Sequence, residues 1–543
     1  MKDNIFGRRD FLLRAPALLG VAAGSAVAAK DEGSETLIAK TTYGQLRGIR
    51  ENGVVVFKGI PYAGPSDGAN RFKPPTKLEP WTGVRDAVEY GPQAIQNRDP
   101  NAPSTAPVAP SSENCQFLNV WTPAVDGRKR PVMFYSHGGG FATGSGGWGK
   151  NPSHDGSALA KNYDVVVVTT NHRLGLVGYL YLGDILGEEY AASGITGMLD
   201  IVKALEWARD NIAAFGGDPG NVMIWGESGG GAKVSTLLAM PAAHGVFHKA
   251  SIESGPGLRM IPREAANETT KALLADLDLT AANARELLKT PVSRLLAFQA
   301  KYVSATRGTM GSFGPVVDGH YLPSNPFDPV APAISKNIPL IVGTNKDETI
   351  FMFEHGPEAA KIFNLDNDGL RQRVEKLLGP KADRTEHVID VYRRSRPNAS
   401  PTDLFVAIST AQWMWANAIT LAERKVEQNG APVYMYMFAY ESEVPVGPGI
   451  NYPMKSAHAM EMAFKFDHPE NNPSTGKRPE RFQAARNMSQ AWATFARTSN
   501  PNFNGLPHWP AYDLKERATM ILNAQCKVVN DPFREERLVW KEM

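Results

Sequence analysis

The chain has 543 residues, 42% of them hydrophobic, and its 58 basic and 56 acidic side chains leave a formal net charge of +2. A chain of this length and apolar content can bury a large core. The small net charge gives no support for binding to nucleic acid or to an anionic membrane. The eleven histidines are scattered, and the sequence contains no internal repeat, zinc-like Cys/His cluster or P-loop.

Residues 1–28 are predicted to be a targeting segment. Arg8 and Arg9 form a twin-arginine pattern, and the small apolar stretch that follows ends in Ala26-Val27-Ala28, an A-x-A cleavage pattern. The stretch is shorter than the roughly 20 residues of a spanning helix, and no later segment is expected to meet that requirement. We therefore expect export by the twin-arginine machinery to the periplasm or the outside, with no membrane anchor in the mature form. A basic amphipathic N-terminus without an export role is the alternative.

Strands and helices alternate along the rest of the chain. Apolar, β-rich runs predict strands at 117–121, 132–136, 165–170, 222–225, 339–342 and 433–438. Apolar residues recur at helical spacing between 199 and 212. This alternation predicts an α/β fold with a mostly parallel sheet covered by helices. Helix-rich stretches at about 263–300 and 359–428 are expected to lie over the carboxyl edge of the sheet, where open α/β sheets bind ligands.

A glycine-rich motif, His137-Gly138-Gly139-Gly140-Phe141, directly follows the predicted strand 132–136. In esterases and lipases such an H-G-G-G element supplies backbone N–H groups that hold an oxyanion. Glycines let these amides approach a ligand because no Cβ atom stands in the way. A flexible glycine loop is the alternative.

A second motif, Gly226-Glu227-Ser228-Gly229-Gly230, lies between an apolar run at 221–225 and a helix-like stretch at 232–238. Strand, sharp turn and helix are the context that a G-x-S-x-G nucleophile elbow requires. The helix N-terminus behind the serine favours a developing negative charge. The pattern alone is weak evidence in a chain with 50 glycines, where an ordinary Gly/Ser turn is the alternative. Two motifs in the right order, each after a strand, favour a catalytic site.

From about Thr41 to Trp540 the chain resembles the type-B carboxylesterases of the α/β-hydrolase fold, which include cholinesterases and bacterial para-nitrobenzyl-type esterases. Besides the two glycine motifs, the resemblance rests on FKGIPYA at 57–63, RF at 71–72, ENCQFLNVW at 113–121, NHR at 171–173 and FGGDP at 215–219. It implies one catalytic domain over 35–543 that carries the two helical insertions. It also implies a Ser–Glu–His triad in that chain order, with Ser228 as the nucleophile.

The resemblance places the triad acid on Glu348, in the N-K-D-E pattern after a predicted strand at 338–343. Asp347 is the alternative, and one of the two is expected to be a solvated loop carboxylate. The resemblance places the base on His458, in an H-x-x-E loop after the last predicted strand. His468 is the alternative and is predicted to be an exposed turn residue.

The family chemistry then assigns a role to each residue of the site. The backbone N–H groups of Gly139, Gly140 and Gly229 are expected to hold the oxyanion, and Glu227 to tune the field of the site. The implied activity is a serine carboxylic-ester hydrolase that forms an acyl-enzyme on uncharged esters, bulky or aromatic ones included, without metal or organic cofactor. A monomer is expected. An amidase or carbamate hydrolase with the same triad is one alternative. A non-catalytic binding member of the fold is another, and the presence of all three triad residues argues against it.

Some features depart from the family pattern or extend it. The family usually pairs the cysteine of its E-x-C element with an upstream cysteine, but Ala94 stands there, so we expect Cys115 and Cys526 to be free thiols. By the same resemblance, Arg71 and Glu113 are expected to form an ion pair.

Two further features concern the substrate. No tryptophan lies between Trp81 and Trp121, whereas cholinesterases carry one there that binds quaternary ammonium, so a choline-ester specialist is not expected. The segment 309–313 resembles an acyl-pocket loop and is mostly small, which predicts room for a bulky or aromatic acyl group.

Overall fold

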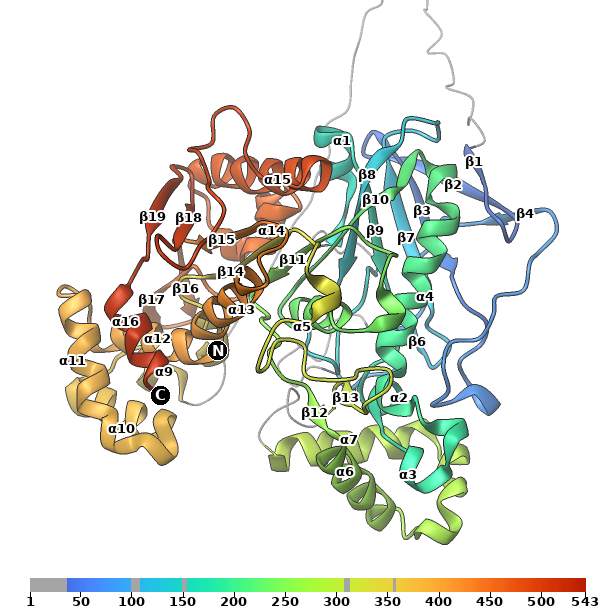
Figure 1. Ribbon diagram of the computed structural model, residues 1–543, viewed down its shortest axis with the longest axis horizontal. Coiled ribbons are helices and arrows are strands. Elements are labelled where there is room, and N and C mark those ends of the chain that lie inside the picture. Colours follow the sequence, from blue (N-terminus) through green and yellow to red (C-terminus); the bar gives the residue numbers. More distant parts are fainter. Residues whose placement is uncertain (1–36, 99–107, 149–153, 307–312, 355–357) are drawn as a thin grey trace, which may run out of the picture. The chain divides into compact units, whose positions relative to one another are not determined.

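The apolar runs of the sequence form the centre of a 13-stranded sheet in the computed structural model (Figure 1). The structure describes residues 37–98, 108–148, 154–306, 313–354 and 358–543. The strand order is β1-β2-β3-β7-β9-β8-β10-β11-β14-β15-β18-β19, and β4 pairs with β2. Every pair from β9 to β18 is parallel, while the pairs toward both edges are antiparallel, apart from β2 with β4. The prediction of a mostly parallel sheet covered by helices is confirmed.

The elements of this domain are bounded as follows. The strands of the large sheet are β1 Leu37–Lys40, β2 Gln45–Glu51, β3 Val54–Pro61, β4 Val84–Asp86, β7 Phe117–Thr122, β8 Arg130–Ser136, β9 Val166–Thr170, β10 Gly217–Glu227, β11 Lys249–Glu253, β14 Leu340–Asn345, β15 Val433–Phe438, β18 Ala518–Leu522 and β19 Lys527–Asn530. Two-stranded ladders join β5 Gln93–Ala94 with β6 Ser111–Ser112, β12 Ile261–Pro262 with β13 Val316–Val317, and β16 Ser442–Gly447 with β17 Ile450–Lys455. The α-helices are α1 Ser157–Tyr163, α2 Gly175–Tyr179, α3 Gly183–Leu186, α4 Thr196–Asn211, α5 Gly229–Leu237, α6 Arg263–Asp276, α7 Val292–Thr306, α8 Ile350–Phe353, α9 Ala359–Ile362, α10 Asn367–Leu378, α11 Thr385–Ser395, α12 Pro401–Thr410, α13 Ala416–Glu427, α14 Glu461–Lys465, α15 Glu480–Thr498 and α16 Arg534–Lys541.

Successive residues of the central strands are buried on opposite faces of the sheet, as strands covered on both sides require. In β10, Val222 and Ile224 belong to the core that includes α4 and α5. Met223 and Trp225 belong to the core that includes α1 and α15 on the other face. All six predicted strands form, which shows that the apolar runs were sufficient to locate them.

The central strand β11 was not predicted, because its sequence, KASIE, is charged at both ends and has no run of apolar residues. Lys249 and Glu253 at its two ends are nevertheless buried. Each has a polar partner: the Lys249 ammonium donates to the side chain of Asn221, and Glu253 pairs with Lys465. Partners from other segments therefore allow a strand with charged ends to be buried.

The two predicted insertions are helical, with α6 and α7 in the first and α9 to α13 in the second. The continuous run Pro401–Glu427 is long and apolar enough to span a membrane by length and composition. The prediction that no later segment meets this criterion was wrong. Within this domain, 72% of its most apolar window is buried, as in a core helix. The predicted signal segment 1–28 and most of the loop 309–313 lie outside the described residues.

The expected ion pair between Arg71 and Glu113 is present and nearly closed to solvent. Arg71 Nε and Nη2 donate to the two carboxylate oxygens of Glu113 at 2.6 and 2.7 Å, and the side chains are 9% and 11% exposed. Arg71 Nη1 also donates to the carbonyl oxygens of Thr290 and Leu288 at 2.7 and 3.1 Å. Arg71 therefore ties the start of the chain to the first insertion.

We expect Arg71→Met to lower the free energy of unfolding by about 3–5 kcal/mol, because it leaves Glu113 buried without a counterion. Arg47→Met is the matched control, since its two-point pair with Asp86 is about half exposed, at 51% and 54%, and its loss should leave the unfolding midpoint nearly unchanged. Denaturant melts of the two variants measure the difference. Equal midpoints would contradict a structural role for the buried pair.

Candidate active site

Ser228 stands at the sharp turn between β10 and α5. Its backbone has φ 58° and ψ −123°, a conformation that costs a non-glycine residue about 1–3 kcal/mol and is typical of a nucleophile elbow. The turn is too tight for larger residues: a Cβ atom on Gly226 would lie 2.5 Å from the backbone carbon of Gly230. The Ser228 N–H donates to the carbonyl oxygen of Glu253 at 2.8 Å, which fixes the turn to β11.

The H-G-G-G loop that follows β8 packs directly against the elbow. A Cβ atom on Gly229 would overlap the carbonyl oxygen of Gly140, so the two backbones touch. Gly139 and Gly140 have φ of 80° and 60°, which glycine adopts without strain. In the described part of the chain, no group accepts a hydrogen bond from the N–H of Gly139, Gly140 or Gly229. Three free donors beside the serine are what an oxyanion hole requires.

Glu348, on the loop after β14, meets His458, on the turn between β17 and α14. Glu348 Oε2 lies 2.6 Å from His458 Nδ1, within hydrogen-bond distance, and Glu348 Oε1 accepts the Asn345 N–H at 2.7 Å. Both side chains are buried. A carboxylate that accepts the Nδ1–H of an imidazole leaves Nε2 free to act as a base.

The two alternatives to these residues lie elsewhere, but they are not exposed. Asp347 faces the Ser456 N–H, at 3.4 Å, and His468 Nε2 lies 3.1 Å from the carbonyl oxygen of Asp155. Both are 6% exposed, so the expectations of a solvated carboxylate and an exposed turn histidine were wrong. The local sequence predicted loops for both residues, and loops were expected to be exposed. In this domain neighbouring segments cover both loops.

The imidazole of His458 also reaches the elbow. Its Nε2 lies 3.3 Å from Glu227 Oε1, next to Ser228 in the chain, and its ring packs on Trp413 at 4.9 Å between centroids. No hydrogen bond between the Ser228 hydroxyl and His458 is present among the described residues. Among the described residues, Glu227 is thus the carboxylate that faces Nε2.

The charges of this pair are coupled. Burial raises the pKa of Glu227. Burial alone would lower the pKa of His458, but the carboxylates of Glu227 and Glu348 outweigh it and raise that pKa. The imidazole must be neutral in order to take the serine proton. The neutral form is favoured when Glu227 itself holds a proton. Protonation of Glu227 and protonation of His458 are therefore linked.

Lys233 was not singled out in the sequence, although it is the one basic residue in the glycine-rich start of α5. It is fully buried, and its ammonium donates to the carbonyl oxygens of His137 and Gly140 at 2.8 and 2.9 Å. Burial lowers the pKa of Lys233 to about 7. No ion pair joins it to a carboxylate in the described ranges. Lys233 therefore anchors the oxyanion loop to the helix that carries Ser228.

We expect Lys233→Met to lower kcat by roughly 10- to 100-fold with little change in KM, because the loop amides lose their anchor and small displacements of catalytic groups are costly. Thermal stability should stay constant or rise, since a buried charge without a carboxylate is removed. Steady-state kinetics and thermal melts measure the two effects.

The control for this variant is Lys425→Met. Lys425 is equally buried and donates to the Lys336 carbonyl and the Gln428 side chain, both at 3.0 Å. This variant should retain the wild-type kcat. Normal kcat together with a lowered melting temperature in Lys233→Met would instead make Lys233 a folding residue only.

A second buried charge cluster lies behind the triad. Lys465 pairs with Glu253 and lies 3.6 Å from Glu461, and all three side chains are fully buried. Glu461 accepts a hydrogen bond at 2.5 Å from the side chain of Asn345, whose backbone N–H holds Glu348. The cluster thus supports the loop that carries Glu348, the candidate triad acid.

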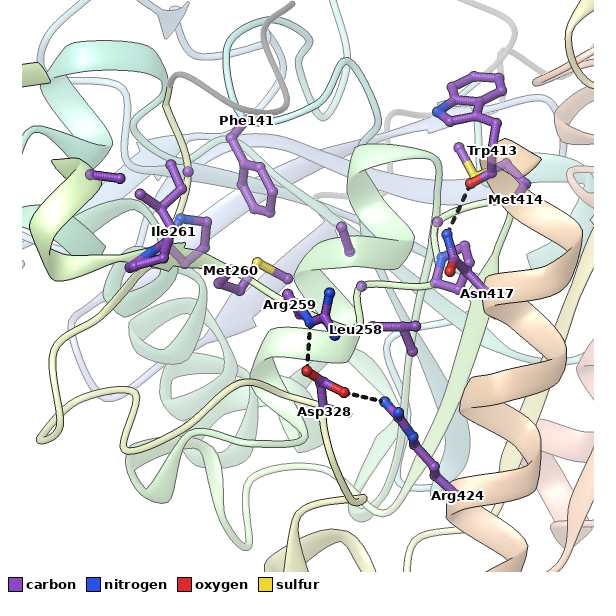
Figure 2. A pocket seen from close by; sticks show the side chains of 18 residues that line it. Phe141, Leu258, Arg259, Met260, Ile261, Asp328, Trp413, Met414, Asn417 and Arg424 are labelled. Atoms are coloured by element: carbon purple, nitrogen blue, oxygen red, sulfur yellow. Dashed lines mark hydrogen bonds and ion pairs between the residues drawn. The ribbon is translucent and has the colours of Figure 1, made fainter. Parts of the chain in front are cut away.

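A cavity of about 560 Å³ lies next to the elbow, and Figure 2 shows the side chains that line it. Its lining includes Phe141 at the end of the oxyanion loop, Trp413 against His458, and Gly255. A Cβ atom on Gly255 would overlap the Ser228 carbonyl oxygen, so the cavity wall touches the elbow. Residues of both insertions, such as Ala265 and Trp413, complete the wall. The cavity is therefore placed to receive part of a substrate.

The two cysteines lie in different parts of the domain. Cys115 is buried against Ala94 and Leu174. Ala94 thus occupies the place beside Cys115 where the family's partner cysteine was expected. Cys526 contacts the side chain of Asn487 at 3.4 Å. Both cysteines are free.

Comparisons with known proteins agree with this geometry. The family model described as the carboxylesterase family matches residues 35–540. The para-nitrobenzyl esterase of Bacillus subtilis is 36% identical over 505 residues, covering 92% of this chain and 97% of the relative. The phenmedipham hydrolase of Pseudarthrobacter oxydans is 31% identical, covering 92% and 98%. A crystal structure of a Geobacillus stearothermophilus carboxylesterase superposes with a TM-score of 0.79 at 38% identity, covering 93% and 99%. The chain belongs to the carboxylesterase family and is a serine carboxylic-ester hydrolase of the α/β-hydrolase fold.

Proposed function

We propose that Ser228, His458 and Glu348 form the catalytic triad and hydrolyse small-molecule esters through an acyl-enzyme. The observation that carries this assignment is the 2.6 Å contact between Glu348 Oε2 and His458 Nδ1 beside the strained turn of Ser228. Ser228 follows β10 and Glu348 follows β14, so both stand at the carboxyl end of a parallel strand, where α/β sheets bind ligands. His458, 110 positions after Glu348, reaches it from the turn after β17.

The chemistry proceeds in two steps. His458 takes the hydroxyl proton of Ser228 as its Oγ attacks the ester carbonyl carbon, while Glu348 stabilises the imidazolium. The N–H groups of the oxyanion loop and Gly229 hold the negative oxygen. The imidazolium gives its proton to the departing alcohol oxygen and leaves an acyl-serine. Water, deprotonated by the same imidazole, then releases the acid.

The substrate range is a further part of the proposal. The relative named para-nitrobenzyl esterase supports aromatic esters as substrates. Amidase or carbamate hydrolase activity on the same triad is the alternative. Rates on a 4-nitrophenyl ester, the matching 4-nitroanilide and the matching carbamate separate these activities. The proposal requires the ester to be turned over fastest.

We also propose that the enzyme is exported. Replacing Arg8 and Arg9 together with lysine should leave uncleaved precursor in the cytoplasm, because a receptor reads the arginine pair rather than its charge. The wild-type mature chain should begin near Ala29. Cell fractionation measures where the protein accumulates, and the intact mass of the product measures where the mature chain begins. Arg14→Lys, outside the pair, should be exported normally. Equal export of the double variant would show that the segment is not a twin-arginine signal.

A further inference from the structure

The cavity beside the triad has an apolar part and a charged part. Phe141, Met260 and Ile261 form the apolar part (Figure 2). Arg259, Asp328 and Arg424 are the only ionisable side chains among its described lining residues. Two arginines and one aspartate give this wall a net charge of +1. A cavity for neutral esters alone has no need of this charge.

Arg259 is the most accessible charge in the cavity. Its Nε donates to Asp328 Oδ2 at 2.5 Å, yet its side chain is 72% exposed. In the described part of the chain, neither Nη group of Arg259 has a hydrogen-bond partner. Figure 2 shows its guanidinium projecting among the other lining side chains. Arg259 is therefore held in place from one side and keeps free donors for a ligand.

Arg424 holds the aspartate from the opposite side. Its Nη1 lies 3.0 Å from Asp328 Oδ1 and also donates to the carbonyl oxygen of Phe327. The Arg424 and Asp328 side chains are only 22% and 17% exposed. Since Asp328 is shared by two cations, it neutralises neither one fully. The Arg259 guanidinium can bind a second carboxylate, donating two hydrogen bonds in the two-point geometry that arginine favours.

The charged wall is linked to the reacting atoms by a short loop. Gly255, whose backbone touches the Ser228 carbonyl, and Arg259 lie four residues apart in one segment that lines the cavity. A substrate bound at Ser228 can therefore place a remote group beside Arg259. We propose that this cavity selects esters that carry a carboxylate away from the scissile bond, and that Arg259 is the residue that recognises it. The proposal rests on the proposed triad and differs from the expectation of uncharged esters.

The test compares matched charged and neutral esters in both parts of the substrate. In the acyl part, mono-4-nitrophenyl adipate is compared with its methyl ester. In the alcohol part, 3-(4-acetoxyphenyl)propanoate is compared with its methyl ester. The ratio of kcat/KM, charged over neutral, should lie between about 1.5-fold and fivefold in at least one pair, the range that a partly exposed ion pair supplies. The ratio should fall as salt is added.

Four variants test whether Arg259 causes the preference for charged esters. Arg259→Gln should bring the ratio close to one, whereas Arg259→Lys should keep part of it because the charge remains. Asp328→Asn should raise the ratio, since it frees both arginines. Arg209→Gln is the control: Arg209 is 49% exposed, pairs with Asp210 at 2.8 Å on α4 and does not line the cavity. It should leave both rates unchanged.

A wild-type ratio at or below one in both pairs, or a ratio that Arg259→Gln leaves unchanged, would overturn the proposal. In either case hydrolysis of the neutral esters would continue, and the proposed triad would stand. Loss of both activities in Ser228→Ala shows that the measured rates belong to this site. Ester turnover that survives Ser228→Ala would reject the triad itself.

Discussion

Ser228→Ala is expected to lower kcat for ester hydrolysis by about 10⁶-fold, because the members of a triad act as a unit and no other group can form the acyl-enzyme. The fold should remain, since alanine is smaller and occupies the same turn. Initial rates with a 4-nitrophenyl ester measure the loss, and a thermal melt checks the fold.

Ser254→Ala is the matched control. Ser254 is another buried serine with positive φ, 45°, on the segment that follows β11. Its replacement should leave most of the activity. If Ser228→Ala kept substantial activity, or Ser254→Ala lost it, the nucleophile would be assigned wrongly.

His458→Ala is expected to lower kcat by a factor similar to that of Ser228→Ala, because serine is a poor nucleophile without its base. His468→Ala should lower stability rather than activity, since His468 is buried against the Asp155 carbonyl. Rates and melting temperatures of both variants, measured side by side, separate the two histidines.

The same comparison applies to the acid. Glu348→Gln should lower kcat strongly, because the amide cannot stabilise the imidazolium. Asp347→Asn should have the smaller effect, since its carboxylate faces Ser456. If the His468 variant lost more activity than the His458 variant, the assignment of the base would be contradicted. If the Asp347 variant lost more activity than the Glu348 variant, the assignment of the acid would be contradicted.

The sequence was sufficient for the elements whose signal is local. The apolar runs located β7, β8, β9, β10, β14 and β15, and the glycine motifs located the elbow and the oxyanion loop. These signals are local because a strand covered on both faces must be apolar, and a tight turn must contain glycine. The choice of Glu348 and His458 needed the family resemblance, since spacing alone left Asp347 and His468 open.

What the sequence could not predict depends on distant partners. Lys465 and Glu253 are 212 positions apart, and each alone resembles a solvated charge. Lys233 resembles a surface residue of a short helix until the oxyanion loop folds over it. The burial of Asp347 and His468 likewise depends on segments that cover their loops. Buried charges with partners from elsewhere in the chain are thus the part of this site that only the structure reveals.

The nucleophile is identified most directly by the position of covalent labelling with a fluorophosphonate, which reacts with activated serines. We expect one label per chain, on the peptide that contains Ser228, with loss of activity in proportion to labelling. No label should form in Ser228→Ala. A label on a different serine that abolishes activity, or complete inactivation without any label on Ser228, would contradict the assignment of Ser228 as the nucleophile.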